Sequence, residues 1–289
     1  MHRNLIIKPL SADNSQQLAD WIETEGWNPG IQDVDTLLRA AHAGWLGIWK
    51  GEQLAGMASV FNHSYKFAFF GLYIIQPEFR QKEFRQLELG ITLNRHRLQM
   101  AGYRNIGLDG VMEQYDNYRH IGFRLAHRTP RYMFTQIVPK PQPNAICDLK
   151  EITLIELLDY ERNNQLFPCR RKTYLKAWLT QTDATGFCYR INQEIMGYGM
   201  IRPCMEGFKI GPLFANTPDI AQDLLLALLS TTNGQKTYCD IPENNEQALL
   251  LAEQLGGTLS GFCSARMYRG FQPELQLQKI YGITSIEAG

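Results

Sequence analysis

Short apolar runs alternate with amphipathic stretches along the chain, and the same order of elements occurs twice. Segment 46–61 has two apolar runs around a polar turn, which predicts an antiparallel hairpin, and segment 187–202 repeats this pattern. A strand-like apolar run follows each hairpin, at 67–75 and at 208–215. Glycines within these elements correspond at offsets of 140 and 141 positions. The pattern therefore indicates an internal repeat.

A helix and further strands complete each unit. Apolar residues at helical spacing from Phe84 onward predict a helix, and Thr217 followed by Pro218 predicts the start of its counterpart. Strands are expected next, at 105–110 and 237–242. A shorter helix and an arginine-containing closing strand then end each unit. Five elements recur in the same order at offsets of 131 to 141 positions, so we interpret the chain as a tandem duplication.

Alternating prolines between the two units predict an extended connector. Pro139, Pro141 and Pro143 exclude a helix there and favour an open conformation. We therefore expect two domains, at 1–138 and 147–289. Their alternating strands and helices predict an α/β (α+β) fold class.

Composition excludes several classes of protein. Apolar residues make up 44% and charged residues 20% of the chain, as in folded globular proteins. Lys plus Arg equals Asp plus Glu at 29 each, so no overall charge favours nucleic acid or an anionic membrane. The first ten residues lack the apolar core of a signal peptide, and no apolar run is long enough to span a bilayer. We expect a cytoplasmic protein.

Cysteine and histidine spacing gives no sign of a metal site. The six cysteines all follow position 146 without a C-x-x-C pair, and the six histidines show no H-E-x-x-H spacing. Reduced cysteines are expected, and no metal is predicted.

The motifs "YIIQPEFRQKEF" and "LDGVMEQYDNYRHIGF" and the closing arginine-rich strand resemble the GNAT (GCN5-related) superfamily of N-acetyltransferases. The segments "EGWNPGIQD", "GYGMIRPCMEGFKIGPLFA", "ARMYRG" and "IYGITSIE" are similar to bacterial tandem acetyltransferases whose second domain is diverged. The resemblance implies tandem GNAT folds. Each would have a mixed, mostly antiparallel sheet with a central parallel strand pair flanked by helices.

In that superfamily acyl-coenzyme A binds where two parallel strands diverge, and a loop [RQ]-x-x-G-x-[GA] holds the pyrophosphate on backbone amides. The corresponding hexamer here is 80–85, in which Glu83 and Arg85 replace the two glycines. Three cations give the hexamer a net charge of +2, which compensates part of that loss. The resemblance implies coenzyme contacts from Ile74, Ile75, Arg80, Gln81, Lys82, Glu83, Phe84, Arg85 and Asn117.

The second unit has no such loop. Only Asn216 and Thr217 separate its strand from its helix, so six residues do not fit between them. We therefore expect the second domain to be structural or to contribute to the acceptor site.

Acyl transfer to an amine requires a proton for the departing thiolate and a neutral amine. The resemblance assigns the acid to Tyr118, five residues before the phenylalanine of a Gly-Phe pair, with Tyr115 as the alternative. Ala252 occupies the equivalent position in the second unit. No base is marked as clearly. Glu25 is the candidate, and Asp33 lies nearby, where the superfamily shapes its acceptor site.

The resulting hypothesis is an N-acetyltransferase that uses acetyl-CoA and a small-molecule or peptide amine. A non-catalytic ligand-binding or sensing protein on a degenerate fold is the alternative, because the loop has lost its glycines. A different acyl carrier also stays open. Trp27 either lines the acceptor pocket or anchors its loop. We expect no nucleic-acid or membrane partner, and a monomer or homodimer.

Overall fold

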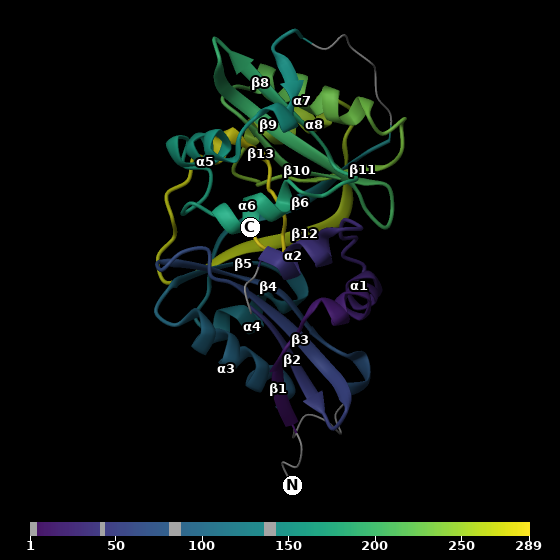
Figure 1. The fold of residues 1–289 in the computed structure, drawn as a ribbon, viewed down its shortest axis with the longest axis vertical. Helices are drawn as coiled ribbons and strands as arrows, with labels where there is room; N and C mark the ends of the chain where they lie inside the picture. The colour runs from purple at the N-terminus through teal and green to yellow at the C-terminus, as the bar shows by residue number, and fades with distance from the viewer. Residues whose placement is uncertain (1–4, 41–43, 81–87, 136–142) are drawn as a thin grey trace.

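A computed structural model describes residues 5–40, 44–80, 88–135 and 143–289. Two halves follow one another along the long axis of the molecule (Figure 1). The first half contains β1 (Leu5–Pro9), α1 (Ser15–Thr24), α2 (Asp33–Ala40), β2 (Trp45–Lys50), β3 (Gln53–Phe61), β4 (Phe67–Ile75), α3 (Leu89–Ala101), β5 (Asn105–Val111), α4 (Tyr115–His120) and β6 (Arg124–Phe134).

The second half repeats this order. It contains β7 (Ile146–Asp148), α5 (Leu154–Asn163), α6 (Lys172–Trp178), β8 (Thr185–Ile191), β9 (Glu194–Pro203), β10 (Phe208–Ala215), α7 (Pro218–Ser230), β11 (Thr237–Asp240), α8 (Glu246–Gln254), β12 (Thr258–Arg269) and β13 (Ile280–Gly282).

Local sequence signals account for many of these boundaries. The β2–β3 and β8–β9 hairpins turn where the polar residues interrupt the apolar runs. Helix α7 begins as expected, because the Thr217 hydroxyl accepts the Ile220 N–H at 3.4 Å and Pro218 occupies the first helical position. Helix α5 begins with a capping box between Thr153 and Glu156.

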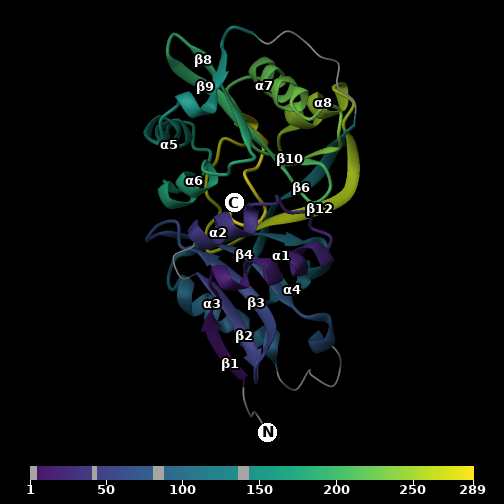
Figure 2. The same cartoon turned by 45° about the vertical axis from the view of Figure 1, so that its right-hand side comes forward.

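The strands of the two halves form a single sheet by exchanging their closing strands. The order is β1-β2-β3-β4-β5-β12-β6-β11-β10-β9-β8-β7. Strand β12, from the end of the chain, pairs with β5 of the first half, and β6 of the first half pairs with β11 of the second. The two closing strands also pair with each other at the junction (Figure 2). The halves therefore share their central strands.

Both halves contain the parallel strand pair of the expected fold. Strands β4 and β5 are parallel and pair from Phe67–Asn105 to Phe70–Leu108, beyond which they diverge. Strands β10 and β11 pair in the same way from Phe208–Thr237 to Ile210–Cys239. Each pair thus opens into a notch, and the two notches differ in what fills them.

The last ten residues, 280–289, form a tail that closes the second notch. Strand β13 pairs antiparallel with β10 at Leu213 and Phe214, and the Ile283 N–H donates to the Asp240 carbonyl at 3.0 Å. The tail then runs toward the first half, where the Glu287 carbonyl packs against Gly71. A Cβ at Gly71 would lie 2.1 Å from that oxygen. The tail is buried and lies at the centre of the molecule (Figure 1).

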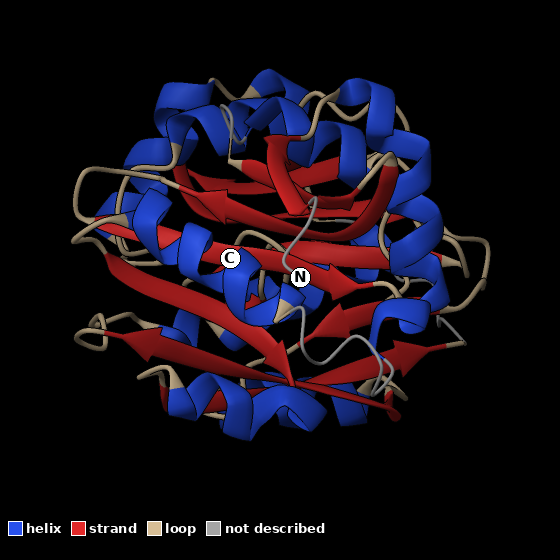
Figure 3. Cartoon of the chain, turned by 90° about the horizontal axis from the view of Figure 1, so that it is seen from below, coloured by secondary structure: helices blue, strands red, loops and turns tan. Residues whose placement is uncertain are grey.

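Helices cover both faces of the sheet (Figure 3). The largest apolar cluster joins the halves, because Phe69 of β4, Tyr174 of α6 and Phe214 of β10 belong to it. Within the described residues no helix has the length and apolar character needed to cross a membrane. All six cysteines carry free thiols, and Cys188, Cys204 and Cys239 are buried.

Candidate active site

A cavity of about 600 Å³ opens at the first notch, where β4 and β5 diverge. It is lined by Glu25, Trp27, Gly71, Leu72, Tyr73, Ile75, Arg80, Asp109, Val111, Glu113, Gln114, Tyr118, Phe262, Ile286 and Glu287. The Gln76 N–H donates to the Ala55 carbonyl of β3 at 3.0 Å. Because backbone polar groups alternate along a strand, Tyr73 and Ile75 turn theirs toward the notch.

Tyr118 lies on α4 at the β5 side of this cavity. Its ring packs across Gly110, where a Cβ would lie 2.5 Å from the ring, and meets the Phe123 ring edge-on at a centroid distance of 6.2 Å. Burial raises the pKa of Tyr118, and the nearby charge of Arg97 opposes that rise. The hydroxyl therefore keeps its proton at neutral pH, as a proton donor must. Tyr115 is not among the residues that line the cavity.

Arg97, on α3, places a buried cation under the notch. Its guanidinium stacks on the Phe70 ring at 4.2 Å and the Tyr73 ring at 5.1 Å, and its Nη2 donates to the Gly71 carbonyl at 3.3 Å. Burial lowers the pKa of Arg97 to about 10, so the group stays charged at neutral pH. The same burial raises the pKa of Tyr73 to about 12. One positive charge thus faces the region where β4 and β5 diverge.

Arg80 and Glu25 form an ion pair at another side of the cavity. Arg80 Nη2 contacts Glu25 Oε1, and Arg80 Nε donates to the Ile75 carbonyl at 2.5 Å. Both side chains keep contact with solvent. The candidate phosphate ligand and the candidate base are therefore bound to each other, and an anion that reaches Arg80 competes with Glu25.

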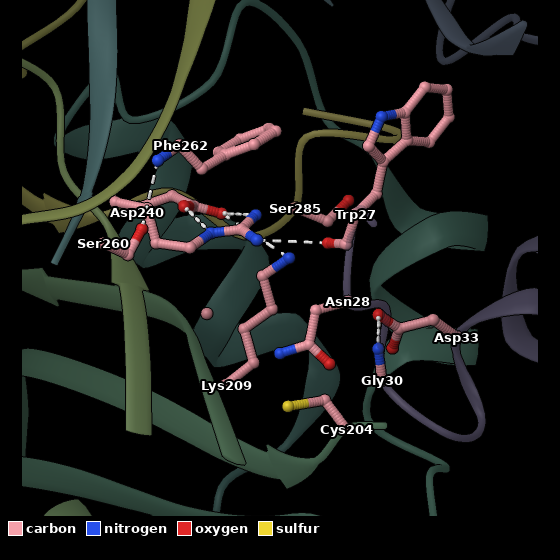
Figure 4. Close-up of polar contacts among 12 residues, drawn as sticks. Trp27, Asn28, Gly30, Asp33, Cys204, Lys209, Asp240, Ser260, Phe262 and Ser285 are labelled. Carbon is pink, nitrogen blue, oxygen red and sulfur yellow. Dashed lines mark hydrogen bonds and ion pairs between the residues drawn. The ribbon is translucent and has the colours of Figure 1, made fainter. Parts of the chain in front are cut away.

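Residues from both halves meet around Arg131, next to two residues that line the cavity. Arg131 of β6 binds Asp240 of β11 through two hydrogen bonds of 2.6 and 3.0 Å and donates to the Trp27 carbonyl at 3.1 Å (Figure 4). Its guanidinium also stacks on Phe262 of β12 at 4.1 Å. Lys209 lies 3.6 Å from Asp240, fully buried. Arg131 therefore fixes the positions of Trp27 and Phe262 at the cavity.

Arg128 and Arg266 occupy corresponding positions in the two repeated units of the sequence, at an offset of 138, but they do not have corresponding contacts in the structure. Arg266 binds Asp109 through two hydrogen bonds of 2.6 Å, and the matching partner of Asp240 is Arg131. Arg128 of β6 is paired instead with Ala265 of β12 in the sheet register. Each notch aspartate is therefore bound by an arginine from the closing strand of the other half.

Asp33 does not line the cavity. Its carboxylate binds Arg202 of β9 at 2.7 and 2.9 Å and accepts the Gly30 N–H at 2.8 Å (Figure 4 shows the Gly30 bond). Burial on its own would raise the pKa of Asp33, but the charge and hydrogen bonds of Arg202 lower it below 3.8. Asp33 is thus an ionised structural anchor of the loop that carries Trp27, and its carboxylate is not available to an acceptor in the cavity.

Comparisons with known proteins agree on one family. A sequence model described as "Acetyltransferase (GNAT) domain" matches residues 160–282. Holothin acyltransferase from Pseudoalteromonas sp. (strain SANK 73390) is 26% identical over 290 residues, which cover 100% of this chain and 96% of that protein. Residues 160–282 thus match the GNAT domain family, and the chain over its whole length is similar to an acyltransferase.

Two solved structures share the fold over nearly the whole chain. A putative acetyltransferase from Pyrococcus horikoshii superposes with a TM-score of 0.82 at 22% identity, covering 99% of this chain and 96% of that one. A tandem GNAT protein from the clavulanic acid biosynthesis pathway gives a TM-score of 0.64 at 13% identity, covering 93% and 100%. These likenesses confirm the predicted fold class, and GNAT proteins take acyl-CoA donors.

The other residues that we expected to contact the coenzyme fall in three groups. Ile75 faces the notch through its backbone, whereas the backbone of Ile74 faces β3 at Met57. Asn117 is exposed on α4 and donates to Gln114 Oε1 at 2.7 Å. Gln81, Lys82, Glu83, Phe84 and Arg85 lie outside the described residues.

Sequence reasoning overlooked Glu287. The carboxylate is 2% exposed, neither oxygen has a hydrogen-bond partner among the described residues, and the residue lines the cavity. It lies about 180 positions from the notch strands, and no periodicity connects a short tail with a distant cavity. The sequence offered one signal for Glu287. It is the acidic residue of the segment "TSIE", which has no counterpart in the first repeated unit.

Proposed function

We propose that the chain transfers an acetyl group from acetyl-CoA to the amine of a small molecule, with catalysis in the first half. The observation that carries this proposal is the open first notch, with Tyr118 on its cavity, beside a second notch that the tail fills. The backbone of Tyr73 and Ile75 and the side chain of Arg80 would hold the coenzyme. A relative named for acyl transfer to holothin supports a small-molecule acceptor.

The residues of the cavity divide the chemistry between them. Tyr118 would give its proton to the thiolate sulfur when the thioester carbon–sulfur bond breaks. The Arg97 charge under the notch would favour the same developing negative charge. Trp27 and Phe262 would position the acceptor. The second domain would then contribute to the acceptor side through Phe262 and would not bind a donor of its own.

Thermal melting with acetyl-CoA tests donor binding. A ligand that binds the folded state adds about 2.7 kcal/mol at a hundredfold excess over Kd, which corresponds to a shift of about 5 °C. We expect Arg80→Ala to reduce this shift. Arg162→Ala is the matched control, because Arg162 is exposed on α5 and joined only to Asp159 at 3.5 Å among the ion pairs described. No shift with the unmodified protein at millimolar acetyl-CoA would contradict the proposal.

Thiol release tests transfer, with holothin, tryptamine, benzylamine and spermidine as acceptors. Tyr118→Phe should lower kcat by about 100-fold or more, the usual contribution of a positioned general acid. Tyr115→Phe should stay close to the unmodified protein, because Tyr115 lies outside the cavity lining. Binding of acetyl-CoA without thiol release from any of the four amines would favour the alternative, a ligand-binding or sensing protein. We expect a monomer or homodimer acting in the cytoplasm.

A further inference from the structure

Four carboxylates line the cavity, and they differ in their partners. Asp109 is held by two hydrogen bonds from Arg266, and Glu25 is paired with Arg80. Glu113 is exposed to solvent in the short 3-10 turn that follows β5. Glu287 is buried, and within the described part of the chain neither of its oxygens accepts a hydrogen bond. A carboxylate that acts as a general base in a covered site must be buried and not already held by a hydrogen-bond partner, and Glu287 alone among the four meets both conditions.

The tail fixes the position of Glu287 without binding its carboxylate. The Ser285 hydroxyl accepts the Ala288 N–H at 3.1 Å, and the His63 Nε2 contacts the Ala288 carbonyl at 2.9 Å. Arg171 holds the Thr284 hydroxyl at 2.8 Å. The Glu287 carbonyl packs on Gly71 of β4, at the beginning of the open notch. The backbone on both sides of Glu287 is therefore anchored, while its side chain keeps its hydrogen-bonding capacity.

Accordingly, we propose that Glu287, carried by the tail of the second domain, accepts the proton of the acceptor amine in the cavity of the first. This inference rests on the proposed function. An acceptor that arrives as R–NH3⁺ loses two protons on becoming an amide. One goes to the Glu287 carboxylate. The nitrogen then attacks the thioester carbon, the carbon–sulfur bond breaks, and the sulfur takes the proton of Tyr118. The second proton of the nitrogen restores the tyrosine hydroxyl.

The charges around Glu287 suit this role. Burial raises the pKa of Glu287 above 4.5, with Lys209 and Arg202 opposing the rise and Asp33 adding to it. Arg131 also faces the group, but Arg131 and Arg202 are each bound to an aspartate of their own. A pKa moved toward neutrality improves a carboxylate as a base. Protein atoms cover both carboxylate oxygens of Glu287. The proton therefore passes from the amine to the carboxylate through one water molecule, or the Glu287 side chain first rotates toward the amine.

The recognition chemistry follows from the same residues. Trp27 and Phe262 contribute aromatic surface to the cavity that Tyr118 also lines, and Glu287 adds a carboxylate residue to the same lining. The substrate class is a small primary amine, protonated in solution, on a flat apolar body. Tryptamine has this form, whereas spermidine lacks the flat apolar body.

The test is the pH profile of kcat/KM for acetyl-CoA and the best acceptor of the four amines. The unmodified protein should gain activity as pH rises through one ionisation. Glu287→Gln should lose that limb and fall about 100-fold or more at pH 7, and Glu287→Asp should recover part of the activity. Glu23→Gln, an exposed change on α1 outside the cavity, is the matched control and should leave the profile unchanged.

Melting curves with acetyl-CoA separate this role from a structural one. Glu287→Gln should keep its fold and its acetyl-CoA shift, because it keeps the shape of the side chain. An unchanged pH profile in Glu287→Gln, or a rise in KM for the amine with kcat unchanged, would overturn the role as a base while leaving the proposed function intact. No transfer by the unmodified protein to any of the four amines would overturn both.

Discussion

Replacing Asp33 by Asn removes one charge from a sealed ion pair between the halves. Asp33 and Arg202 are each 1% exposed and share hydrogen bonds of 2.7 and 2.9 Å. The Arg202 guanidinium also stacks on the Trp178 ring at 4.4 Å, so it has no path to solvent when its partner is lost. A buried cation without its counter-charge is strongly unfavourable.

Removing one member of such a pair costs about 3–5 kcal/mol of unfolding free energy. For a domain of this size that lowers the melting temperature by roughly 6–20 °C. Arg202→Gln should be similarly destabilising. The double variant should cost less than the sum of the two singles by at least about 1 kcal/mol, because its two neutral amides leave no charge uncompensated.

Urea unfolding at pH 7 measures the free energy of unfolding of the unmodified protein, the two single variants and the double variant. Asp20→Asn, an exposed change on α1, is the control and should stay within about 0.5 kcal/mol of the unmodified protein. The folded pKa of Asp33 is lowered, so the contribution of the pair is present above pH 3.8 and is lost as pH falls through that lower folded pKa. A loss below about 1 kcal/mol for Asp33→Asn, or additive single effects, would refute the reasoning.

Three further predictions concern the tail and a buried histidine. Gly71→Ala should lower the free energy of unfolding by about 1–3 kcal/mol and reduce transfer, because its methyl group would lie 2.1 Å from the Glu287 carbonyl oxygen. An unchanged melting temperature would show that the tail moves aside without a loss of stability. Burial disfavours the ionised form of Glu287 in the folded protein, so the unmodified protein should lose stability relative to Glu287→Gln as pH rises above 4.5. Melting temperatures across pH 4–8 check the sign of this difference. Burial lowers the pKa of His127 to about 3, whereas the same imidazole in the unfolded chain binds a proton below pH 6.5. The free energy of unfolding should therefore fall by about 2 kcal/mol by pH 5, and His127→Asn should abolish that loss in urea titrations.

Local patterns predicted the repeated elements, and the resemblance to the GNAT superfamily implied the parallel pair and its notch. The hairpin turns and the start of α7 at Thr217 depend on neighbouring residues, whose spacing the sequence displays directly. The cavity position of Tyr118 also follows from its place on the helix after β5. The short interval between β10 and α7 correctly excluded a six-residue loop in the second half.

Contacts between residues that lie far apart in the chain could not be predicted from the sequence. Asp33 meets Arg202 across 169 positions and Asp109 meets Arg266 across 157, and neither separation has a period or motif that marks it. The tail has no counterpart in the first half, so the repeat gave no information on where it lies. Glu287 was missed for this reason, whereas Glu25 was proposed although Arg80 neutralises it.

The exchange of closing strands has a consequence for synthesis of the chain. Strand β5 ends at Val111, but its sheet neighbour β12 begins at Thr258, about 150 residues later in the chain. At about 5–20 residues per second, translation takes about ten to thirty seconds to cover that interval. During this time the β5 edge has no permanent neighbour, and open strand edges promote association between chains. Ribosome pausing within 143–257 should therefore increase aggregation of the nascent protein more than pausing before Asn105.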